Sequence, residues 1–176
     1  MEYIEAKTIL SPYKYQAEWF GSHYHMNLYK GCNHGCIYCD SRSECYHVED
    51  FDRVRGKKDA LKILETELRG KKRKGVVGIG AMSDCYNPME RVYHQTSGAL
   101  ELLDQYRFGV TFATKSDLVV RDIPLLRRIM THSPVLVMMT ITAVEDKLSQ
   151  RIEPHVVPSS KRFEALRQLS EAGIPT

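Results

Sequence analysis

The sequence alternates between strand-like and helix-like segments, and this alternation limits the folds open to the chain. The strand-like segments span residues 26–31, 76–80, 110–114 and 135–141, and the helical ones span residues 60–68, 93–106, 122–130 and 160–172. This order predicts a parallel sheet with right-handed crossover connections. Because the carboxyl ends of parallel strands share one edge, the residues that follow the strands are expected to meet there.

The composition is that of an ordinary globular protein. The chain has 176 residues, of which 43% are hydrophobic and 27% charged, enough for one domain with a core. We expect residues 1–22 to be an N-terminal extension and residues 23–176 to be the core domain. Residues 1–5 lack the features of a signal peptide, and the longest apolar stretch, residues 135–144, is too short to span a bilayer. These features predict a cytoplasmic protein with no membrane partner.

Three cysteines follow the first strand-like segment with the spacing C-x3-C-x2-C. They are Cys32, Cys36 and Cys39. Three closely spaced thiolates predict a metal centre that lacks one protein ligand, because a [4Fe–4S] cluster usually takes four cysteines. A cluster held by three would leave one iron free to bind a small molecule.

Zinc and disulfide interpretations of the same cysteines remain open. Structural zinc sites are mostly closed by four Cys or His ligands, commonly in two separated pairs. A fourth ligand would have to come from His34, Asp40, Cys45 or His47, none of which sits at a zinc spacing. A disulfide among five cysteines would leave one thiol over, and nothing places the chain in an oxidising compartment.

Polar residues also follow the other strand-like segments, as a shared active site would require. The stretch from Gly80 to Pro88 follows the second segment, and the third is followed by Lys115. Residues 32–39 are called the cysteine loop below. The candidate site residues outside it are Ser83, Asp84, Lys115, Thr140, Arg151 and Glu153.

These motifs together resemble one protein family. The motifs are Cys-Asn-His-Gly-Cys-Ile-Tyr-Cys at 32–39, Ser-Asp-x-Tyr-x-Pro at 83–88, Thr-Lys-Ser at 114–116, Arg-Ile-Glu-Pro at 151–154 and Leu-Ser-Glu-Ala-Gly-Ile-Pro at 169–175. The chain resembles the radical S-adenosylmethionine (SAM) superfamily, and within it the spore photoproduct lyase-related branch, often labelled "DNA repair photolyase". The resemblance runs from about Tyr24 to the last residue.

The resemblance implies a fold and an activity. The fold would be a partial parallel (β/α) barrel, here cut off after about four βα units, so we interpret the chain as the N-terminal portion of a longer protein. The three cysteines would hold a [4Fe–4S] cluster, and SAM would bind its open iron. An electron from a flavodoxin or ferredoxin would cleave SAM to a 5′-deoxyadenosyl radical, which would act on an unknown substrate; a nucleic acid is compatible with the family.

The resemblance also implies roles for individual residues. Tyr38 would pack near the adenine of SAM, and Ser83 and Asp84 would contact its methionyl or ribose part. The cation for the SAM carboxylate would be Lys115. The other implied SAM contacts are Thr140, Arg151 and Glu153.

One departure from the family pattern concerns the step in which a hydrogen atom is returned to the product radical. Spore photoproduct lyases return a hydrogen atom from a cysteine near the end of the second strand, where this chain has Ala81 and Met82. Cys85 comes slightly later, and neither it nor Cys45 receives a role. Two other functions remain open, namely a zinc- or cluster-stabilised nucleic-acid-binding module that uses the basic run 71–74, and an iron–sulfur electron carrier.

Overall fold

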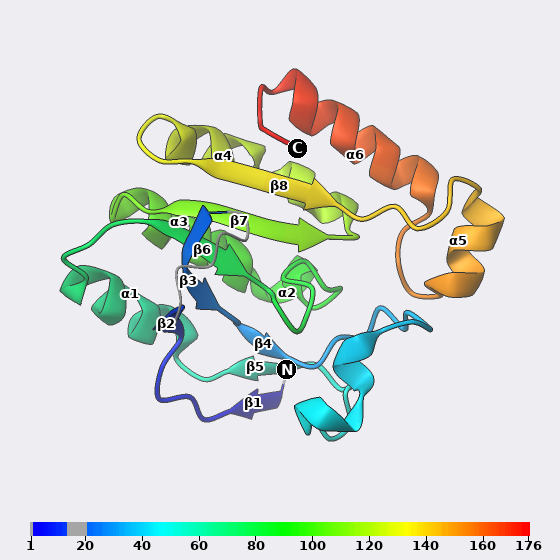
Figure 1. Ribbon diagram of the computed structural model, residues 1–176, viewed down its shortest axis with the longest axis horizontal. Coiled ribbons are helices and arrows are strands. Elements are labelled where there is room, and N and C mark those ends of the chain that lie inside the picture. Colours follow the sequence, from blue (N-terminus) through cyan, green and yellow to red (C-terminus); the bar gives the residue numbers. More distant parts are fainter. Residues whose placement is uncertain (1, 14–20) are drawn as a thin grey trace.

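The computed structural model describes residues 2–13 and 21–176. Its main sheet has five strands in the spatial order β2 (Leu10–Pro12), β3 (Ser22–Met26), β6 (Val76–Ile79), β7 (Gly109–Thr114) and β8 (Val135–Met139). The last four run parallel, and β2 lies antiparallel to β3. The sheet is open rather than closed into a barrel within the described residues (Figure 1). The predicted α/β fold with a parallel sheet is therefore confirmed.

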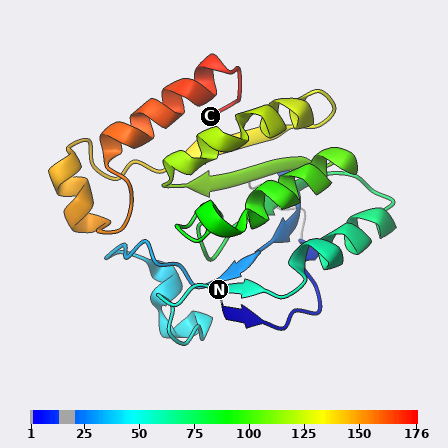
Figure 2. The same cartoon turned by 180° about the vertical axis from the view of Figure 1, so that it is seen from behind.

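Four longer helices cover one face of this sheet. Figure 2 shows them side by side in front of the strands. They are α1 (Ala60–Gly70), α3 (Gln95–Gln105), α4 (Ile123–Met130) and α6 (Ser159–Glu171). Each follows one parallel strand along the chain, so the four predicted βα units are present. The short elements are α2 (Glu90–Tyr93), α5 (Asp146–Ile152), η2 (Asp40–Arg42), η3 (Glu44–Tyr46) and η4 (Asp117–Asp122). The sequence did not predict α5.

The core lies between the sheet and these helices. Alternate residues of β6 and β7 point toward the helices, because successive side chains of a strand lie on opposite faces. Val77 and Phe112 are among them, and both are buried. The helices contribute the buried side chains Leu64, Leu68, Leu100, Leu103, Leu126 and Ile129. No helix among the described residues is long and apolar enough to cross a membrane.

The predicted first strand at 26–31 is wrong in its bounds. The parallel strand β3 ends at Met26, whereas β4 (Tyr29–Lys30) belongs to a second, three-stranded sheet with β5 (Arg55–Lys57) and β1 (Glu2–Ile4). The β3 sequence Ser-His-Tyr-His-Met buries Tyr24 and Met26 and leaves the two histidines half-buried. Apolar residues therefore occur only at alternate positions of this short strand, too few to predict it from the sequence. Within the predicted extension 1–22, β1 and β2 pair with strands of the core, and the domain boundary stays a prediction.

Candidate functional site

The cysteine loop begins where β4 ends. The amide of Cys32 donates a 2.8 Å hydrogen bond to the carbonyl of Phe51. Gly31 precedes it with φ of 84°, and a Cβ there would lie 2.5 Å from the same carbonyl oxygen. A side chain at this position is excluded, since it would strain the backbone and collide with it. Glycine therefore allows the chain to enter the loop at this close crossing.

The segment 152–155 supports the cysteine loop from the other side. The amide of Ile37 donates to the carbonyl of Ile152 at 3.0 Å, and the amide of His155 donates to the carbonyl of His34 at 3.1 Å. Gly35 faces the His155 ring so closely that a Cβ would lie 2.9 Å from it. The end of the Arg-Ile-Glu-Pro motif and the residue after it thus pack against the cysteine loop and hydrogen-bond to it.

A pocket of ≈ 170 Å³ lies between the cysteine loop and the carboxyl ends of the parallel strands. It contains seven of the predicted site residues, namely Cys32, Cys36, Cys39, Ser83, Asp84, Lys115 and Thr140. The remaining three, Tyr38, Arg151 and Glu153, do not line it. Segments distant in the sequence therefore meet at the edge of the sheet where the alternation predicted a site.

The carboxylate of Asp84 connects three segments around this pocket: its own loop, the end of β7 and the cysteine loop. Its Oδ1 accepts hydrogen bonds from the Tyr86 amide and the Thr114 hydroxyl, both at 2.8 Å. Its Oδ2 accepts the Lys115 amide at 2.8 Å and lies 3.4 Å from Nδ1 of His34. Both carboxylate oxygens are thus engaged by the chain itself. Asp84 joins the cysteine loop to the ends of β6 and β7.

Lys115 brings a positive charge to the pocket. Its ammonium lies 5.8 Å from the centre of the Tyr38 ring, and the described residues give it no ion-pair partner. Ser83 faces the same space and donates through Oγ to the carbonyl of Tyr29 at 3.3 Å. A hydroxyl and a cation without a counter-ion suit a small ligand that carries a carboxylate.

Glu153 belongs to a buried ion pair beside the pocket. Glu153 and Arg162 are both 0% exposed, and their side chains meet at 2.7 Å. The carboxylate also accepts hydrogen bonds from the hydroxyls of Tyr38 and Thr142, while Arg162 donates to the carbonyl of Thr140 at 2.9 Å. Although burial opposes ionisation, these hydrogen bonds and the guanidinium hold the pKa of Glu153 below its ordinary value. The sequence did not identify Arg162; the available signal was its helical spacing with the buried Ala165 and Leu169 in α6.

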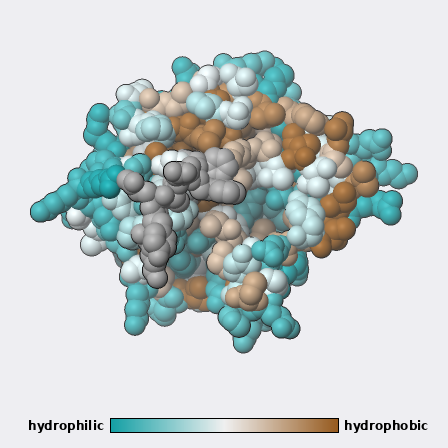
Figure 3. Space-filling model, viewed as in Figure 1, coloured by the Kyte–Doolittle hydropathy of each residue, from teal (hydrophilic) through white to brown (hydrophobic). Residues whose placement is uncertain are grey.

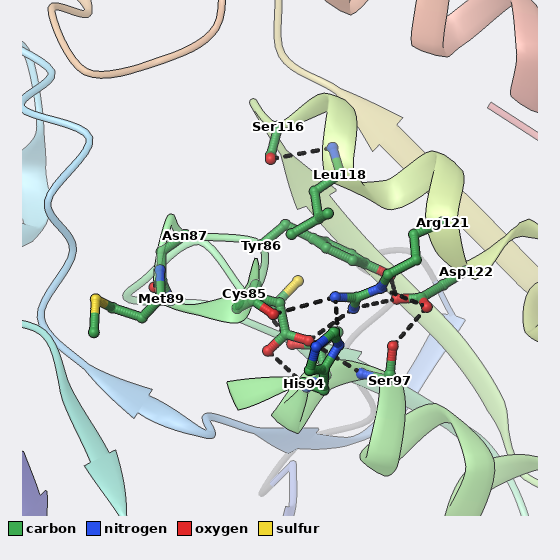
Figure 4. Close-up of polar contacts among 12 residues, drawn as sticks. Cys85, Tyr86, Asn87, Met89, His94, Ser97, Ser116, Leu118, Arg121 and Asp122 are labelled. Atoms are coloured by element: carbon green, nitrogen blue, oxygen red, sulfur yellow. Dashed lines mark hydrogen bonds and ion pairs between the residues drawn. The ribbon is translucent and has the colours of Figure 1, made fainter. Parts of the chain in front are cut away.

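A polar network supports the loop that carries Ser83 and Asp84. The hydroxyls of Tyr86 and Ser97 donate to the carboxylate of Asp122 at 3.0 Å and 2.6 Å. Arg121 lies between two carboxylates and makes 2.8 Å ion pairs with Glu90 and Asp122. Figure 4 shows Ser97 of α3 and Arg121 and Asp122 of η4 close to the Tyr86 side chain of this loop. Tyr86 therefore anchors the loop rather than lining the pocket.

The two cysteines without a predicted role differ in their surroundings. Cys85 directly follows Asp84 in the loop, but its side chain is buried in the core and does not line the pocket. Burial raises the pKa of this thiol well above its ordinary value. Cys45 lies in η3 and is exposed. Cys85 is thus a packing side chain.

The two thiols are expected to react differently with iodoacetamide. Because the thiolate is the nucleophile, the native protein should be alkylated at Cys45 and spared at Cys85, and urea should make both react. Peptide mass spectrometry resolves the two sites, and a Cys45→Ser variant is the control for assignment. Rapid labelling of Cys85 in the native state would contradict the burial of this thiol.

The three loop cysteines line the same pocket. No group of three Cys, His, Asp or Glu side chains among the described residues lies close enough together to hold one metal ion. A zinc ion needs such a group, because all its ligands bind the same atom. In an iron–sulfur cluster each cysteine binds a different iron, so its thiols stand further apart. Three thiols in one pocket are the type of donor that an iron–sulfur cluster takes.

Comparison with known proteins places this chain in a family. Residues 26–176 match the Radical SAM superfamily. The chain is 34% identical over 173 residues to Uncharacterized protein MJ0683 of Methanocaldococcus jannaschii, covering 97% of this chain and 62% of that protein. It is 27% identical over 158 residues to Uncharacterized protein Rv2578c of Mycobacterium tuberculosis, covering 86% and 46%. The chain therefore spans about half to three fifths of the length of these relatives.

Solved structures share the fold. The structure of spore photoproduct lyase complexed with dinucleoside spore photoproduct matches with a TM-score of 0.68 at 16% identity, covering 98% of this chain and 48% of that one. The cobalamin-dependent SAM radical enzyme OxsB matches with a TM-score of 0.58 at 16% identity, covering 86% and 22%. These likenesses agree with the fold that the motifs predicted. By the match over residues 26–176 and the relative at 34% identity, the chain belongs to the radical SAM superfamily.

Proposed function

We propose that the protein is a radical SAM enzyme that holds a [4Fe–4S] cluster through Cys32, Cys36 and Cys39. The observation that supports this most is the single pocket in which these thiols face Ser83 and Lys115 from two strand ends. Membership of the superfamily implies an iron–sulfur cluster and SAM. The number of cysteines then favours the type of cluster, because three thiolates leave one of four irons free. The reducing conditions that such thiolates need favour a cytoplasmic location.

The surroundings of the thiols favour a cationic centre. Burial, followed by the nearby Asp84 carboxylate, raises the pKa of the Cys32 thiol to about 11. A bare thiolate is therefore costly here, and iron would supply the positive charge that offsets the cost when the proton leaves. Cys36 is affected in the same direction, again chiefly by burial.

The chain's own residues would orient SAM. When bound, the reduced cluster supplies the electron that cleaves SAM to methionine and a 5′-deoxyadenosyl radical. Lys115 would pair with the SAM carboxylate, and the hydroxyls of Ser83 and Thr140 would accept or donate to its polar groups. Asp84 would act by positioning, since its oxygens already hold the Lys115 backbone and the cysteine loop. These contacts would hold SAM in one orientation beside the cysteine loop.

Nucleic acid is the substrate class to test first. The fold resembles that of spore photoproduct lyase, whose solved complex contains a dinucleoside spore photoproduct. The burial of Cys85 argues against that thiol as a hydrogen donor to a product radical. Repair of the same lesion by the same route is therefore not part of the proposal.

Electron paramagnetic resonance of anaerobically reconstituted, reduced protein tests the function. A [4Fe–4S]⁺ signal that changes when SAM is added, together with release of 5′-deoxyadenosine, is the expected result. A cluster signal that SAM leaves unaltered would favour an electron carrier. Retention of zinc with no iron would overturn the proposal.

Replacing Lys115 with alanine is expected to weaken SAM binding without loss of the cluster. A hydrogen bond to a charged group contributes about 1.5–3 kcal/mol, so the dissociation constant should rise by roughly ten- to a hundredfold. Anaerobic calorimetry measures SAM binding, and iron analysis measures cluster content. Lys72→Ala, in the loop between α1 and β6, is the matched control. Equal SAM affinity in both variants would show that Lys115 does not hold the cofactor.

A further inference from the structure

The helix α5 and the tip of the cysteine loop expose apolar and basic side chains together. Ile37 is 74% exposed, Val144 75% and Leu148 44%. Lys147 and Arg151 are exposed as well. We call these five residues the α5 face. Figure 3 shows hydrophobic side chains gathered at the right of the molecule, where Figure 1 places α5 and the loop beneath it.

The two cations of the α5 face lie on one side of the helix, because Lys147 and Arg151 are four residues apart within α5. Leu148 belongs to the same helix, and Val144 lies just before its first turn. The described residues give Lys147 and Arg151 no ion-pair partner. Asp146 is engaged elsewhere, since it accepts the Ser160 amide at 2.8 Å and the Ser160 hydroxyl at 2.7 Å. The face therefore combines an exposed apolar centre with two unpaired cations, and Glu145 adds one exposed carboxylate at its margin.

The α5 face adjoins the loop that would hold the cluster. Ile37 lies between Cys36 and Cys39 in the sequence, and its amide donates to the carbonyl of Ile152 at the end of α5 at 3.0 Å. Ile37 does not line the pocket, whereas all three cysteines do. The α5 face is thus the outer side of the cysteine loop, and the pocket with its SAM-binding residues is the inner side.

On these observations we propose that the α5 face docks a small, acidic one-electron carrier in its reduced state. The inference rests on the proposed function. The carrier loses one electron and the cluster gains it, and no bond is made or broken. Electron transfer falls steeply with distance, so the carrier must approach the cysteine loop closely. On the proposed function SAM would occupy the inner side, which leaves the outer side for the carrier.

The chemistry of the α5 face suits such a partner. Exposed apolar side chains supply the contact area that desolvates on docking. Unpaired Lys147 and Arg151 attract carboxylates, which raises the association rate and makes it sensitive to salt. A negatively charged flavodoxin meets both requirements and serves as the probe.

Charge reversal tests the docking face. The double variant Lys147→Glu/Arg151→Glu should bind the flavodoxin at least about tenfold more weakly at low salt, and the flavodoxin should reduce its cluster correspondingly more slowly. Reduction of the same variant by dithionite should be unchanged, because this small reductant needs no docking face. Lys72→Glu/Arg73→Glu makes the same change of charge in the loop between α1 and β6 and should bind as the unaltered protein does.

The outcomes separate this inference from the proposed function. Flavodoxin binding that is equal in both variants would overturn the docking face while leaving the function intact. Self-association or nucleic-acid binding that is lost on reversal, with flavodoxin binding retained, would also overturn it. Failure of dithionite to reduce a cluster in the unaltered protein would overturn the proposed function instead.

Discussion

Replacing Cys36 with alanine is expected to abolish cluster binding and, with it, the cleavage of SAM. Cys36 is the middle cysteine of the motif and is buried against the pocket. With two thiolates left, two of the four irons would lack a protein ligand, and such a cluster would not persist. Iron and sulfide analysis of the reconstituted variant, with its paramagnetic resonance spectrum, measures the loss.

The matched control for this variant is Cys45→Ala. Cys45 is exposed and does not line the pocket, so its removal should leave iron content and the SAM-dependent signal unchanged. Circular dichroism of both variants without iron should match that of the unaltered protein, since a single small side chain is changed. Full iron content in Cys36→Ala would show that the metal centre uses other ligands.

Replacing Arg162 with methionine is expected to lower the free energy of unfolding by about 3–5 kcal/mol, because Glu153 would remain charged and buried without its partner. Both side chains are 0% exposed. The loss should extend to the pocket, since Arg162 also donates to the carbonyl of Thr140. Urea unfolding followed by circular dichroism measures the change.

Two controls make the Arg162 result specific. Arg167 lies on the same helix α6 but forms exposed ion pairs with Glu164 and Glu171, so Arg167→Met should change stability little. The double variant Glu153→Gln/Arg162→Met removes both charges and should recover much of the lost stability. A similar loss in the double variant would show that packing, rather than an unpaired charge, causes the effect.

The same ion pair makes a prediction about pH. The pKa of Glu153 is lowered in the folded state, so its contribution to stability is complete above the ordinary glutamate pKa of about 4.3. The contribution is lost as the pH falls through the lower, folded-state pKa. Between these pH values the difference in unfolding free energy between the unaltered protein and Glu153→Gln should shrink as acid is added. A difference that is constant across this range would contradict the lowered pKa.

The sequence predicted the order of helices and strands well because the spacing of apolar residues along each segment indicates its type. Leu64 and Leu68 recur on one face of α1, and Val76 and Val77 open a buried strand. The strand β3 was misplaced because two of its five side chains, His23 and His25, are half-buried histidines that interrupt the apolar pattern. Local patterns show which side chains are apolar, and they do not show which sheet a short segment joins.

The sequence predicted most of the residues that line the pocket, but not the hydrogen bonds and ion pairs that connect them. The pocket unites the three cysteines with Ser83 and Lys115, as the strand-end argument required. The contacts of Asp84 and Glu153 were not predictable, because each pairs with residues from distant segments. His34 is 50 positions from Asp84, and Tyr38 is 115 positions from Glu153. Such pairings depend on tertiary geometry, which no local spacing encodes.

Asp84 has a thermodynamic consequence for the order in which the pocket fills. One carboxylate holds the cysteine loop through His34 and the Lys115 backbone through its amide. On the proposed function, the metal would bind to the first of these segments and SAM to the second. Metal loading and SAM affinity should therefore be cooperative, and linkage requires each to strengthen the other by the same factor. If the proposed cluster and SAM bind in this pocket, a lower metal occupancy would therefore weaken the binding of SAM.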